Sequence, residues 1–250
     1  MEALIENYGL WSLLGVALVA LITSSVHGAT GVAGGFLLSA ALAPIIGVAP
    51  IIPVVSVSLL ISHSARALLN AKDFEKSAFF AVSIPALPCI IIMALVYGRM
   101  SSSLIALILG CVILISIPLR RWAKAREIKT SRTMLSSVSV VYGTLSGVSI
   151  GPGMLLVPFM LGYGLRKEQF VATLAVIALL TNITRVGVFG STNLLSSEFI
   201  LIGILCGLIT IPGNWIGRTF LRRMTNDNHA GLVDVLTVLG ALNFFWLSTQ

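Results

Sequence analysis

The chain has 250 residues, of which 57% are hydrophobic and 10% are charged, and its formal net charge is +7. Such a composition leaves too little polar sequence for the surface of a soluble domain, so it indicates a polytopic membrane protein. It also excludes a separate soluble catalytic or nucleotide-binding domain, because the longest polar stretch runs only from 120 to 133. The basic residues lie in short loops between apolar runs, which indicates membrane topology rather than binding to nucleic acid.

The N-terminal segment, 1–9, contains two glutamates and no basic residue. Because it lacks the positive region of a cleaved signal peptide, we expect the apolar run that follows it to be retained. That run, 10–26, is separated from a second apolar run, 31–46, by a first glycine-rich break, GATGVAGG at 28–35. Unwound backbone is tolerated inside a bilayer only beside a cavity or within protein, so the break is a candidate binding site.

Six further runs of roughly 17 to 21 apolar residues are each long enough to cross the hydrocarbon core once. They are 51–69, 77–97, 103–119, 170–189, 199–217 and 230–248. The three cysteines lie inside apolar runs without the spacing of a metal site, so we interpret them as small buried hydrophobic residues. No cofactor or metal is expected.

A second glycine-rich break, GVSIGPGMLL at 147–156, separates the apolar runs 134–148 and 153–163. The later run covers ~16 Å at ~1.5 Å per residue, about half of the ~30 Å hydrocarbon core. Each broken pair of runs is therefore predicted to form a re-entrant hairpin or a broken helix.

The two breaks occupy matching places in two halves of the chain. Gly35-Phe36-Leu37-Leu38 pairs with Gly153-Met154-Leu155-Leu156 at an offset of 118 residues, and the segment 62–66 pairs with 181–185 at an offset of 119. We therefore predict two transmembrane repeats, 1–119 and 134–250, joined by a basic cytoplasmic linker at 120–133.

The basic residues decide how the repeats are oriented. If each broken pair returns to its starting side and the N-terminus is external, the loops 70–76, 120–133, 164–169 and 218–229 are cytoplasmic and hold thirteen of the sixteen basic residues. This agrees with the positive-inside rule. The predicted fold is thus an all-α polytopic membrane protein with two inverted-topology repeats, about 8–10 membrane segments in all. Each repeat consists of a glycine-broken, hairpin-like pair and three spanning helices, and both termini are external.

Ionisable groups inside apolar segments are costly, so each one suggests a function. Arg66 and Arg185 hold equivalent places in the two repeats, near helix ends. Either arginine attracts anions, and Arg185 is the stronger candidate for contact with a substrate. The alternative is that both side chains snorkel to the membrane interface. His27 and His63 are candidates for gating or proton coupling, or else structural hydrogen-bond donors. Asp234 is a candidate cation or proton site, or an interfacial residue.

The breaks themselves expose backbone amides where a helix begins again, at Gly34 or Gly153. Free N–H groups at a helix N-terminus bind small oxyanions without a charged side chain. The alternative is close helix packing through small residues. The predicted substrate-binding residues include members of both breaks and two residues of the run 170–189. They are Gly31, Gly34, Gly35, Ser149, Gly151, Gly153, Asn182 and Arg185.

This pair of motifs resembles the sulfite exporter TauE/SafE family of membrane permeases, in which a stretch of the type G-x-G-G-G-x-L-x-x-P occurs once in each half. Residues 31–38 and 147–158 stand at those places, and the resemblance covers nearly the whole chain. The first half departs from the motif at Ala33 and at Ser39-Ala40, where the second half has Val157-Pro158. The resemblance implies transport of small sulfur-containing or carboxylate anions, such as sulfite, sulfoacetate or thiosulfate, across a bacterial or archaeal inner membrane.

The favoured function is a secondary transporter or facilitator of a small sulfur-containing or organic oxyanion, working by alternating access around a midplane site. An ion channel or a cation-coupled carrier for another small solute is the alternative. An enzyme is not expected, because no serine and histidine group with a third orienting residue is visible. The expected partners are a small anion and the lipid bilayer. A proton or sodium gradient as energy source, the direction of transport and the oligomeric state stay open.

Overall fold

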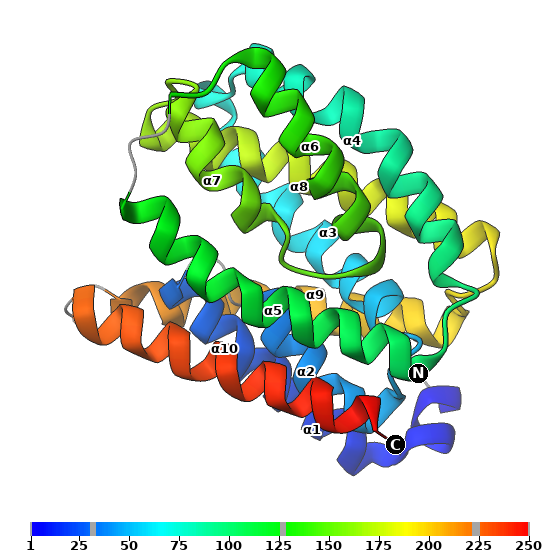
Figure 1. Cartoon of the computed structure of the whole chain (residues 1–250). Helices are drawn as coiled ribbons and strands as arrows, with labels where there is room; N and C mark the ends of the chain where they lie inside the picture. The colour runs from blue at the N-terminus through cyan, green and yellow to red at the C-terminus, as the bar shows by residue number, and fades with distance from the viewer. Residues whose placement is uncertain (1, 31–33, 126–128, 222–225, 250) are drawn as a thin grey trace.

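The computed structural model describes residues 2–30, 34–125, 129–221 and 226–249, and within them it contains helices and loops but no strand. Figure 1 shows the arrangement of ten α-helices. They are α1 (Glu2–Thr30), α2 (Gly34–Ile46), α3 (Ile51–Leu69), α4 (Lys76–Tyr97), α5 (Ser102–Ala125), α6 (Arg132–Val148), α7 (Gly153–Gly162), α8 (Lys167–Ser191), α9 (Ser197–Leu221) and α10 (Asn226–Ser248), with a 3₁₀ turn at Ala71–Asp73. The predicted all-α fold is confirmed.

The apolar runs mark the helices closely. The run 51–69 coincides with α3, and the helices begin again at Gly34 and at Gly153, as the breaks indicate. Two helices run further than their apolar stretches. α5 continues to Ala125, so the basic segment 120–133 begins as helix, and α9 continues to Leu221. Charged residues end a hydropathy signal but do not end a helix, because lysine and arginine are good helix formers.

The second break is extended backbone between two helix ends. After α6, Ser149 has φ −147° and ψ 169°, and Gly151 has φ +101°, a conformation that favours glycine. Pro152 then caps the N-terminus of α7, which has only 10 residues. At ~1.5 Å per residue α7 is ~15 Å long, too short to cross a bilayer.

The second broken pair folds back on itself. The backbone N–H of Thr130, just before α6, donates to the carbonyl of Gly162, the last residue of α7, at 3.0 Å. The start of α6 and the end of α7 therefore lie together, and the pair is a hairpin whose tip is the glycine break.

The loops gather at two opposite ends of the helices. At one end, the Ser77 and Tyr163 hydroxyls are 3.0 Å apart, and the Glu75 N–H donates to Thr173 Oγ1 at 3.0 Å. The loop before α4 thus lies beside the loop between α7 and α8. At the other end of α4, the Tyr97 hydroxyl donates to the carbonyl of Ala49 at 2.8 Å, which places the loop between α2 and α3 there.

Helices from both halves of the chain are mixed in two groups. α4 packs against α6 and α8, and with α7 they enclose one apolar core. In the other group, α9 packs against α1 and α3, beside α2, α5 and α10. Figure 1 shows α4, α6 and α7 in the upper part and α1, α2 and α10 in the lower part. α3 and α8 pack against each other, as do α5 and α10, and thereby join the groups.

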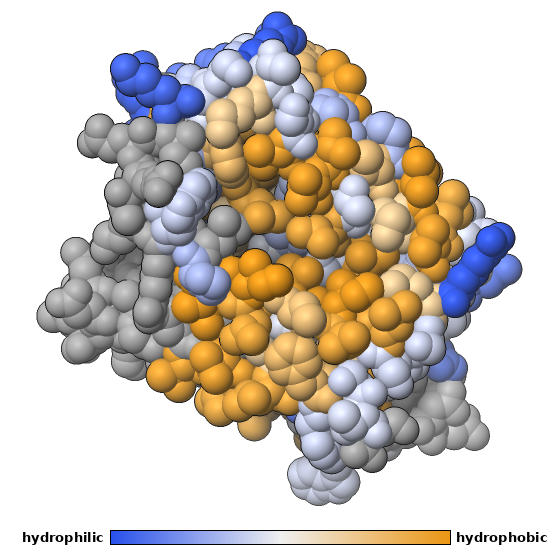
Figure 2. Space-filling view, in the orientation of Figure 1, coloured by the Kyte–Doolittle hydropathy of each residue, from blue (hydrophilic) through white to orange (hydrophobic). Residues whose placement is uncertain are grey.

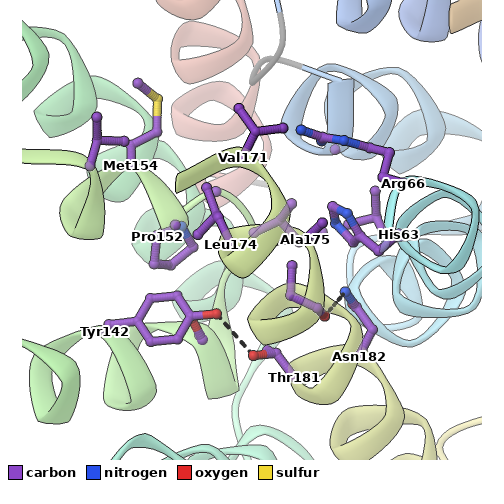
Figure 3. A pocket seen from close by; sticks show the side chains of 18 of the residues that line it. His63, Arg66, Tyr142, Pro152, Met154, Val171, Leu174, Ala175, Thr181 and Asn182 are labelled. Atoms are coloured by element: carbon purple, nitrogen blue, oxygen red, sulfur yellow. Dashed lines mark hydrogen bonds between the residues drawn. The ribbon is translucent and has the colours of Figure 1, made fainter. Parts of the chain in front are cut away.

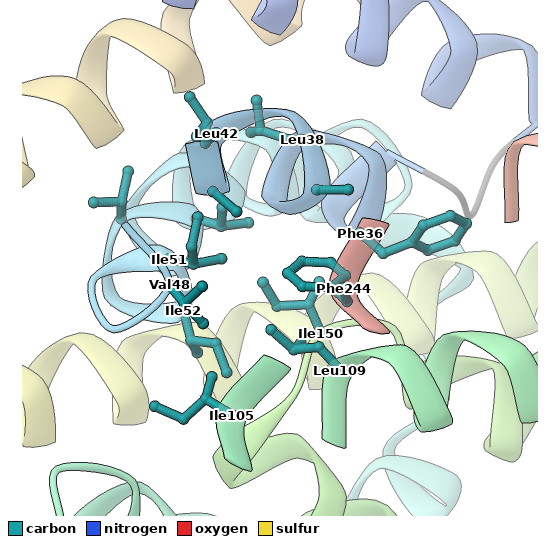
Figure 4. Packing of buried hydrophobic residues seen from close by; sticks show 14 of the residues in the cluster. Phe36, Leu38, Leu42, Val48, Ile51, Ile52, Ile105, Leu109, Ile150 and Phe244 are labelled. Atoms are coloured by element: carbon teal, nitrogen blue, oxygen red, sulfur yellow. The ribbon is translucent and has the colours of Figure 1, made fainter. Parts of the chain in front are cut away.

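The second core gathers side chains from distant parts of the chain. Figure 4 shows Phe36 and Leu42 of α2, Ile51 of α3, Leu109 of α5 and Phe244 of α10 around one centre. Ile150, at the tip of the second hairpin, belongs to the same core. Burial of these side chains holds the tip of one half of the chain against helices of the other half, at ~1.5–3 kcal/mol for each fully buried large side chain.

The outer surface is apolar. Within the described residues, four helices are long and apolar enough to cross a membrane, namely α3, α4, α8 and α9. Large apolar side chains such as Ile84 and Ile92 of α4, Leu208 of α9 and Leu242 of α10 are half exposed or more. Figure 2 shows a broad hydrophobic area across one face, with hydrophilic residues gathered toward its edges. The protein is a multi-pass integral membrane protein, with this surface facing lipid.

Glycines on α6 allow close packing against α4. A Cβ at Gly143 would lie 2.5 Å from the carbonyl oxygen of Ala86, and one at Gly147 would clash with Met93 Cβ. Gly147, counted in the second break by its sequence, is therefore a helix-packing residue, in the spacing that brings membrane helices together.

We expect Gly147→Ala to destabilise the fold. The added methyl group meets backbone and a Cβ, which cannot move freely, and overpacking of this kind costs ~1–3 kcal/mol. Thermal unfolding in detergent should therefore shift to lower temperature. Gly187→Ala on α8, where no atom lies within 4 Å of the new Cβ, is the control and should leave the transition unchanged or raise it. Equal unfolding temperatures for Gly147→Ala and the unmodified protein would contradict the packing role.

Candidate substrate-binding site

A cavity of about 440 Å³ lies between α3, α6, α7 and α8 and reaches the N-terminus of α2. Its lining includes Gly35 from the first break and Gly151 and Gly153 from the second. Figure 3 shows the side chains around it, with Tyr142 of α6, Pro152 and Met154 at the second break, Leu174 of α8 and His63 of α3. The cavity thus lies where the two hairpin-like pairs and the pair α3–α8 come together.

The two glycine breaks touch each other beside this cavity. A Cβ at Gly35 would lie 2.8 Å from Ile150 Cγ2 and 3.3 Å from Leu59 Cδ1. One at Gly151 would lie 3.8 Å from the ring of Phe36. The absence of a side chain at Gly35 therefore lets α2 begin directly against the tip of the second hairpin.

Arg185 is buried at the inner end of the cavity, with 3% of its surface exposed. Its Nη2 donates to the carbonyl oxygens of Ser146 and Ser149, at the end of α6. The last carbonyl groups of a helix that ends inside the membrane have no hydrogen-bond donors of their own, and Arg185 provides a donor here. Its positive charge also opposes the negative end of the α6 dipole. Arg185 therefore holds the second break in place, and its Nε is buried without a hydrogen bond.

Polar side chains of α6 and α8 surround this end of the cavity. The Tyr142 and Thr181 hydroxyls are 2.9 Å apart, and Thr181 Oγ1 also donates to the carbonyl of Ile177 at 2.9 Å. Asn182 Nδ2 donates to the carbonyl of Ala178 at 2.7 Å, while its Oδ1 is buried and has no partner. Unsatisfied buried polar atoms are rare, so Arg185 Nε and Asn182 Oδ1 mark a place where a polar ligand or water fits.

His63 and Arg66 of α3 line the other end of the cavity. Figure 3 shows Arg66 near Val171 and His63 near Ala175, both on α8. The cavity therefore has a guanidinium group at each end. None of the described residues that line it is acidic, and two of them are arginines. The described part of the chain contains no cluster of three or more histidine, cysteine or acidic residues that could hold a metal ion.

The structure brings together most of the residues singled out from the sequence. Seven of them line this one cavity: Gly35, Gly151, Gly153, Asn182, Arg185, His63 and Arg66. Ser149 is buried beside it, where its hydroxyl donates to Leu145 and its carbonyl accepts from Arg185. Gly34 is buried at the start of α2. Gly31 and the side chains of His27 and Asp234 lie outside the described residues.

Sequence reasoning missed several lining residues. Tyr142 and Ser146 are four residues apart, about one turn of helix, on the last turns of α6 before the second break, and this spacing of polar residues is a signal that was available. Met154, Phe170 and Leu174 are apolar residues in apolar helices, so no pattern distinguishes them from lipid-facing or core positions.

Comparison with known protein families finds a match. A family model described as sulfite exporter TauE/SafE matches residues 16–244, which include both breaks and every described residue that lines the cavity. No curated protein and no solved structure matches the chain. The proteins of that family are membrane transporters. Since the match extends over most of the 250 residues, the chain belongs to the sulfite exporter TauE/SafE family.

Proposed function

We propose that this protein is a secondary transporter or facilitator of small sulfur-containing or organic oxyanions, with the substrate held where the two glycine breaks meet. The observation that carries the proposal is the cavity itself. It adjoins both breaks, has an arginine at each end and has no acidic residue among the described residues of its lining. Buried cations in a membrane protein attract anions and mark their pathway. The N-terminus of α7, beside Gly153, adds the positive end of a helix dipole, although the N–H groups of Met154 and Leu155 donate to the carbonyls of Gly151 and Pro152.

We further propose that residues 1–119 and 134–250 form inverted repeats that alternate access to this site. The pattern of helix packing supports this reading. If α1–α5 are matched in order with α6–α10, the contact of α1 with α9 corresponds to that of α6 with α4, and α3 with α9 to α8 with α4. When two repeats are related by a pseudo-two-fold axis, each repeat can adopt the conformation of the other, and the binding site then opens to the opposite side of the membrane.

The proposed orientation places both termini outside and the loops 70–76, 120–133, 164–169 and 218–229 in the cytoplasm of a bacterial or archaeal cell, at its inner membrane. Glu75, Ser77 and Thr130 form hydrogen bonds with residues on either side of the loop 164–169, which brings the first three of these loops to one end of the helices and supports the proposal. The cavity residues Arg66, Phe170 and Val171 lie near that end of α3 and α8. The described state is then the one open toward the cytoplasm.

A proton gradient is the proposed energy source, with His63 as the coupling group beside Arg66. Protonation of its imidazole would add a second positive charge to this end of the cavity. Anion and proton would then bind together. His63→Gln keeps a polar side chain of similar size but cannot take up the proton.

Flux into liposomes tests these statements. We expect sulfite or a small sulfonate to be taken up with saturation, faster when the proton gradient runs in the same direction, and the gradient effect to be lost in His63→Gln. Liposomes without protein are the control for leakage. Uptake that grows linearly with concentration at channel-like rates would favour an ion channel, and no uptake of any anion would reject the proposed function. A gradient effect that persists in His63→Gln would reject only the coupling role.

A further inference from the structure

The cavity ends partway along both α3 and α8. On α8 the described lining residues run from Phe170 to Arg185, and on α3 from Leu59 to Arg66. The described residues that follow Arg185 on α8, and those that precede Leu59 on α3, do not line it. Arg66, near the end of α3, lies beside Val171, near the start of α8, so the parts of these two helices without a cavity also lie together. The site is therefore closed at the end of the helices away from the loops 70–76 and 164–169.

Fully buried side chains of α3 fill this closed end. Ile51, Ile52 and Val55 belong to the second core, and none of their surface is exposed. Figure 4 shows the two isoleucines within that core. Ile52 and Val55 share a helix face with Leu59, since residues three and four apart lie one above the other. One face of α3 therefore lines the cavity in its later part and is tightly packed in its earlier part.

An aromatic pair holds this closed end together. Phe189 of α8 and Tyr97 of α4 are buried in the same core, and their ring centroids are 5.4 Å apart at an interplanar angle of 53°. The Tyr97 hydroxyl donates to the carbonyl of Ala49 at 2.8 Å. Ala49 lies in the loop that leads into α3, so this hydrogen bond holds the start of α3 against the end of α4.

Each of the buried α3 residues has a counterpart on α8 that lines the cavity. At the offset of 119 residues that pairs 62–66 with 181–185, four lining residues of α8 correspond to four residues of α3 with no exposed surface. If the two repeats exchange conformations, these residues of α3 come to line an open path and their counterparts on α8 become packed. The pairs are Phe170 with Ile51, Val171 with Ile52, Leu174 with Val55 and Ala175 with Ser56.

Ser56 gives independent support for such a second state. Its hydroxyl is completely buried, one helical turn after Ile52, and has no hydrogen-bond partner. A buried polar group without a partner costs free energy, so each one in a native structure needs an explanation. Water in an open path beside α3 would satisfy the hydroxyl. Ser56 therefore favours the state in which this end of α3 is hydrated.

We propose that a gate on α3 is the second entrance to the site, and that Tyr97 holds it closed in the described state. The gate opens when the Tyr97 hydroxyl leaves its acceptor and this end of α3 separates from α4 and α8. In the proposed orientation it faces the outside of the cell. The inference rests on the proposed function, because it takes alternating access as the way in which the site works. The α3 gate consists of Ile51, Ile52, Val55 and Ser56.

Labelling of single cysteines tests the α3 gate. The full-length protein carries Val55→Cys in the gate, or Leu174→Cys at its counterpart. A membrane-impermeant maleimide is added to whole cells, where it reaches only the outside, and to inside-out vesicles, where it reaches only the cytoplasmic side. We expect Val55→Cys to react from the outside and Leu174→Cys from the cytoplasmic side. In both variants the native cysteines are replaced, by Cys89→Ala, Cys111→Ala and Cys206→Ala.

Val57→Cys in the same background is the matched control. Val57 lies on α3 two residues after Val55, but its side chain faces α9, since a Cβ at Gly203 would lie 2.7 Å from Val57 Cβ. Its counterpart on α8, Val176, is not among the described lining residues. The control should therefore react from neither side. If Val55→Cys does not fold, Ile52→Cys provides the same test.

Two further changes should shift the α3 gate in opposite directions. Tyr97→Phe removes the hydrogen bond to Ala49, so labelling of Val55→Cys from the outside should become about two- to tenfold faster. Ser56→Ala removes the hydroxyl without a partner and stabilises the packed gate, so the same labelling should become about fivefold slower or more. A core that is merely loosened would react faster in both variants.

The outcomes separate this inference from the proposed function. Reaction of Val55→Cys and Leu174→Cys from the same side would overturn the gate, as would no reaction of Val55→Cys even together with Tyr97→Phe. If such a protein still transports anions into liposomes, the proposed function holds and the second entrance lies elsewhere. If the two cysteines react from opposite sides but the unmodified protein transports no anion, the gate holds and the proposed substrate class is wrong.

Discussion

Arg185→Leu is expected to reduce anion transport about tenfold to a hundredfold and to lower the stability of the protein. The guanidinium group donates to the carbonyls of Ser146 and Ser149 and lies at the end of the cavity where its Nε is buried without a hydrogen bond. A hydrogen bond to a charged group contributes ~1.5–3 kcal/mol, and every ~1.4 kcal/mol is a factor of ten in binding, so losing the contact between Nε and the anion gives about tenfold to a hundredfold. Initial rates of uptake into liposomes measure the effect.

The structural and the binding roles of Arg185 can be separated with Arg185→Lys. Lysine keeps the charge and donates to one or two acceptors, but it lacks the planar fork that serves the break and the anion at once. We therefore expect Arg185→Lys to unfold near the temperature of the unmodified protein and to bind anions at least tenfold more weakly. Arg99→Leu, which removes a positive charge from an exposed loop, is the matched control for Arg185→Leu. If a folded Arg185→Lys variant transports anions normally, the role of Arg185 is structural and its role in anion binding is wrong.

Gly35→Ala is expected to block transport, and Ile150→Ala is expected to restore it. The new Cβ of Gly35→Ala would lie 2.8 Å from Ile150 Cγ2, closer than side chains pack, so the two breaks must separate at a cost of ~1–3 kcal/mol. Removing the Ile150 side chain beyond Cβ opens that space. Paired measurements on the two single variants and the double variant give the coupling energy between the breaks.

Gly153→Ala provides the control for this experiment. Its Cβ would lie 3.8 Å from the nearest atom, Leu174 Cδ1, which is an ordinary contact. We therefore expect Gly153→Ala to insert into membranes and to transport anions at the rate of the unmodified protein, although Gly153 begins α7 and lines the cavity. A bulkier side chain, as in Gly153→Phe, would fill the cavity and stop transport. If Gly35→Ala is inactive and the double variant is no better, the contact between the breaks is not the cause of the loss.

Much of this fold can be predicted from the sequence, because the lipid bilayer imposes simple rules. Apolar runs of about twenty residues must be helices, and a glycine-rich interruption must lie within protein. For this reason the ends of α3, the start of α2 and the start of α7 agree with the sequence. The continuation of α5 to Ala125 could not be predicted in the same way, because hydropathy measures only the part of a helix that contacts lipid.

The details of the site depend on tertiary contacts that no local pattern contains. Gly147 and Gly151 are four residues apart in one motif, yet Gly147 packs against Met93 of α4 whereas Gly151 turns the chain with φ +101°. The sequence likewise favoured Arg185 as an intramembrane cation but did not indicate that the ends of its side chain are held by backbone carbonyls of another helix. Both distinctions follow from the neighbour that each residue meets after folding.

The mixing of helices from the two halves has a consequence for biogenesis. α1 packs against α9, which follows it by more than 160 residues in the chain, so the small residues of α1 that meet α9, such as Ser24 against Gly213, stay without their partner during most of synthesis. Contacts of such high sequence separation form late. α1 therefore stays in the membrane without its packing partner until α9 has been inserted. A ribosome stalled before α9 should leave a chain that is inserted but not compact, and therefore open to proteolysis.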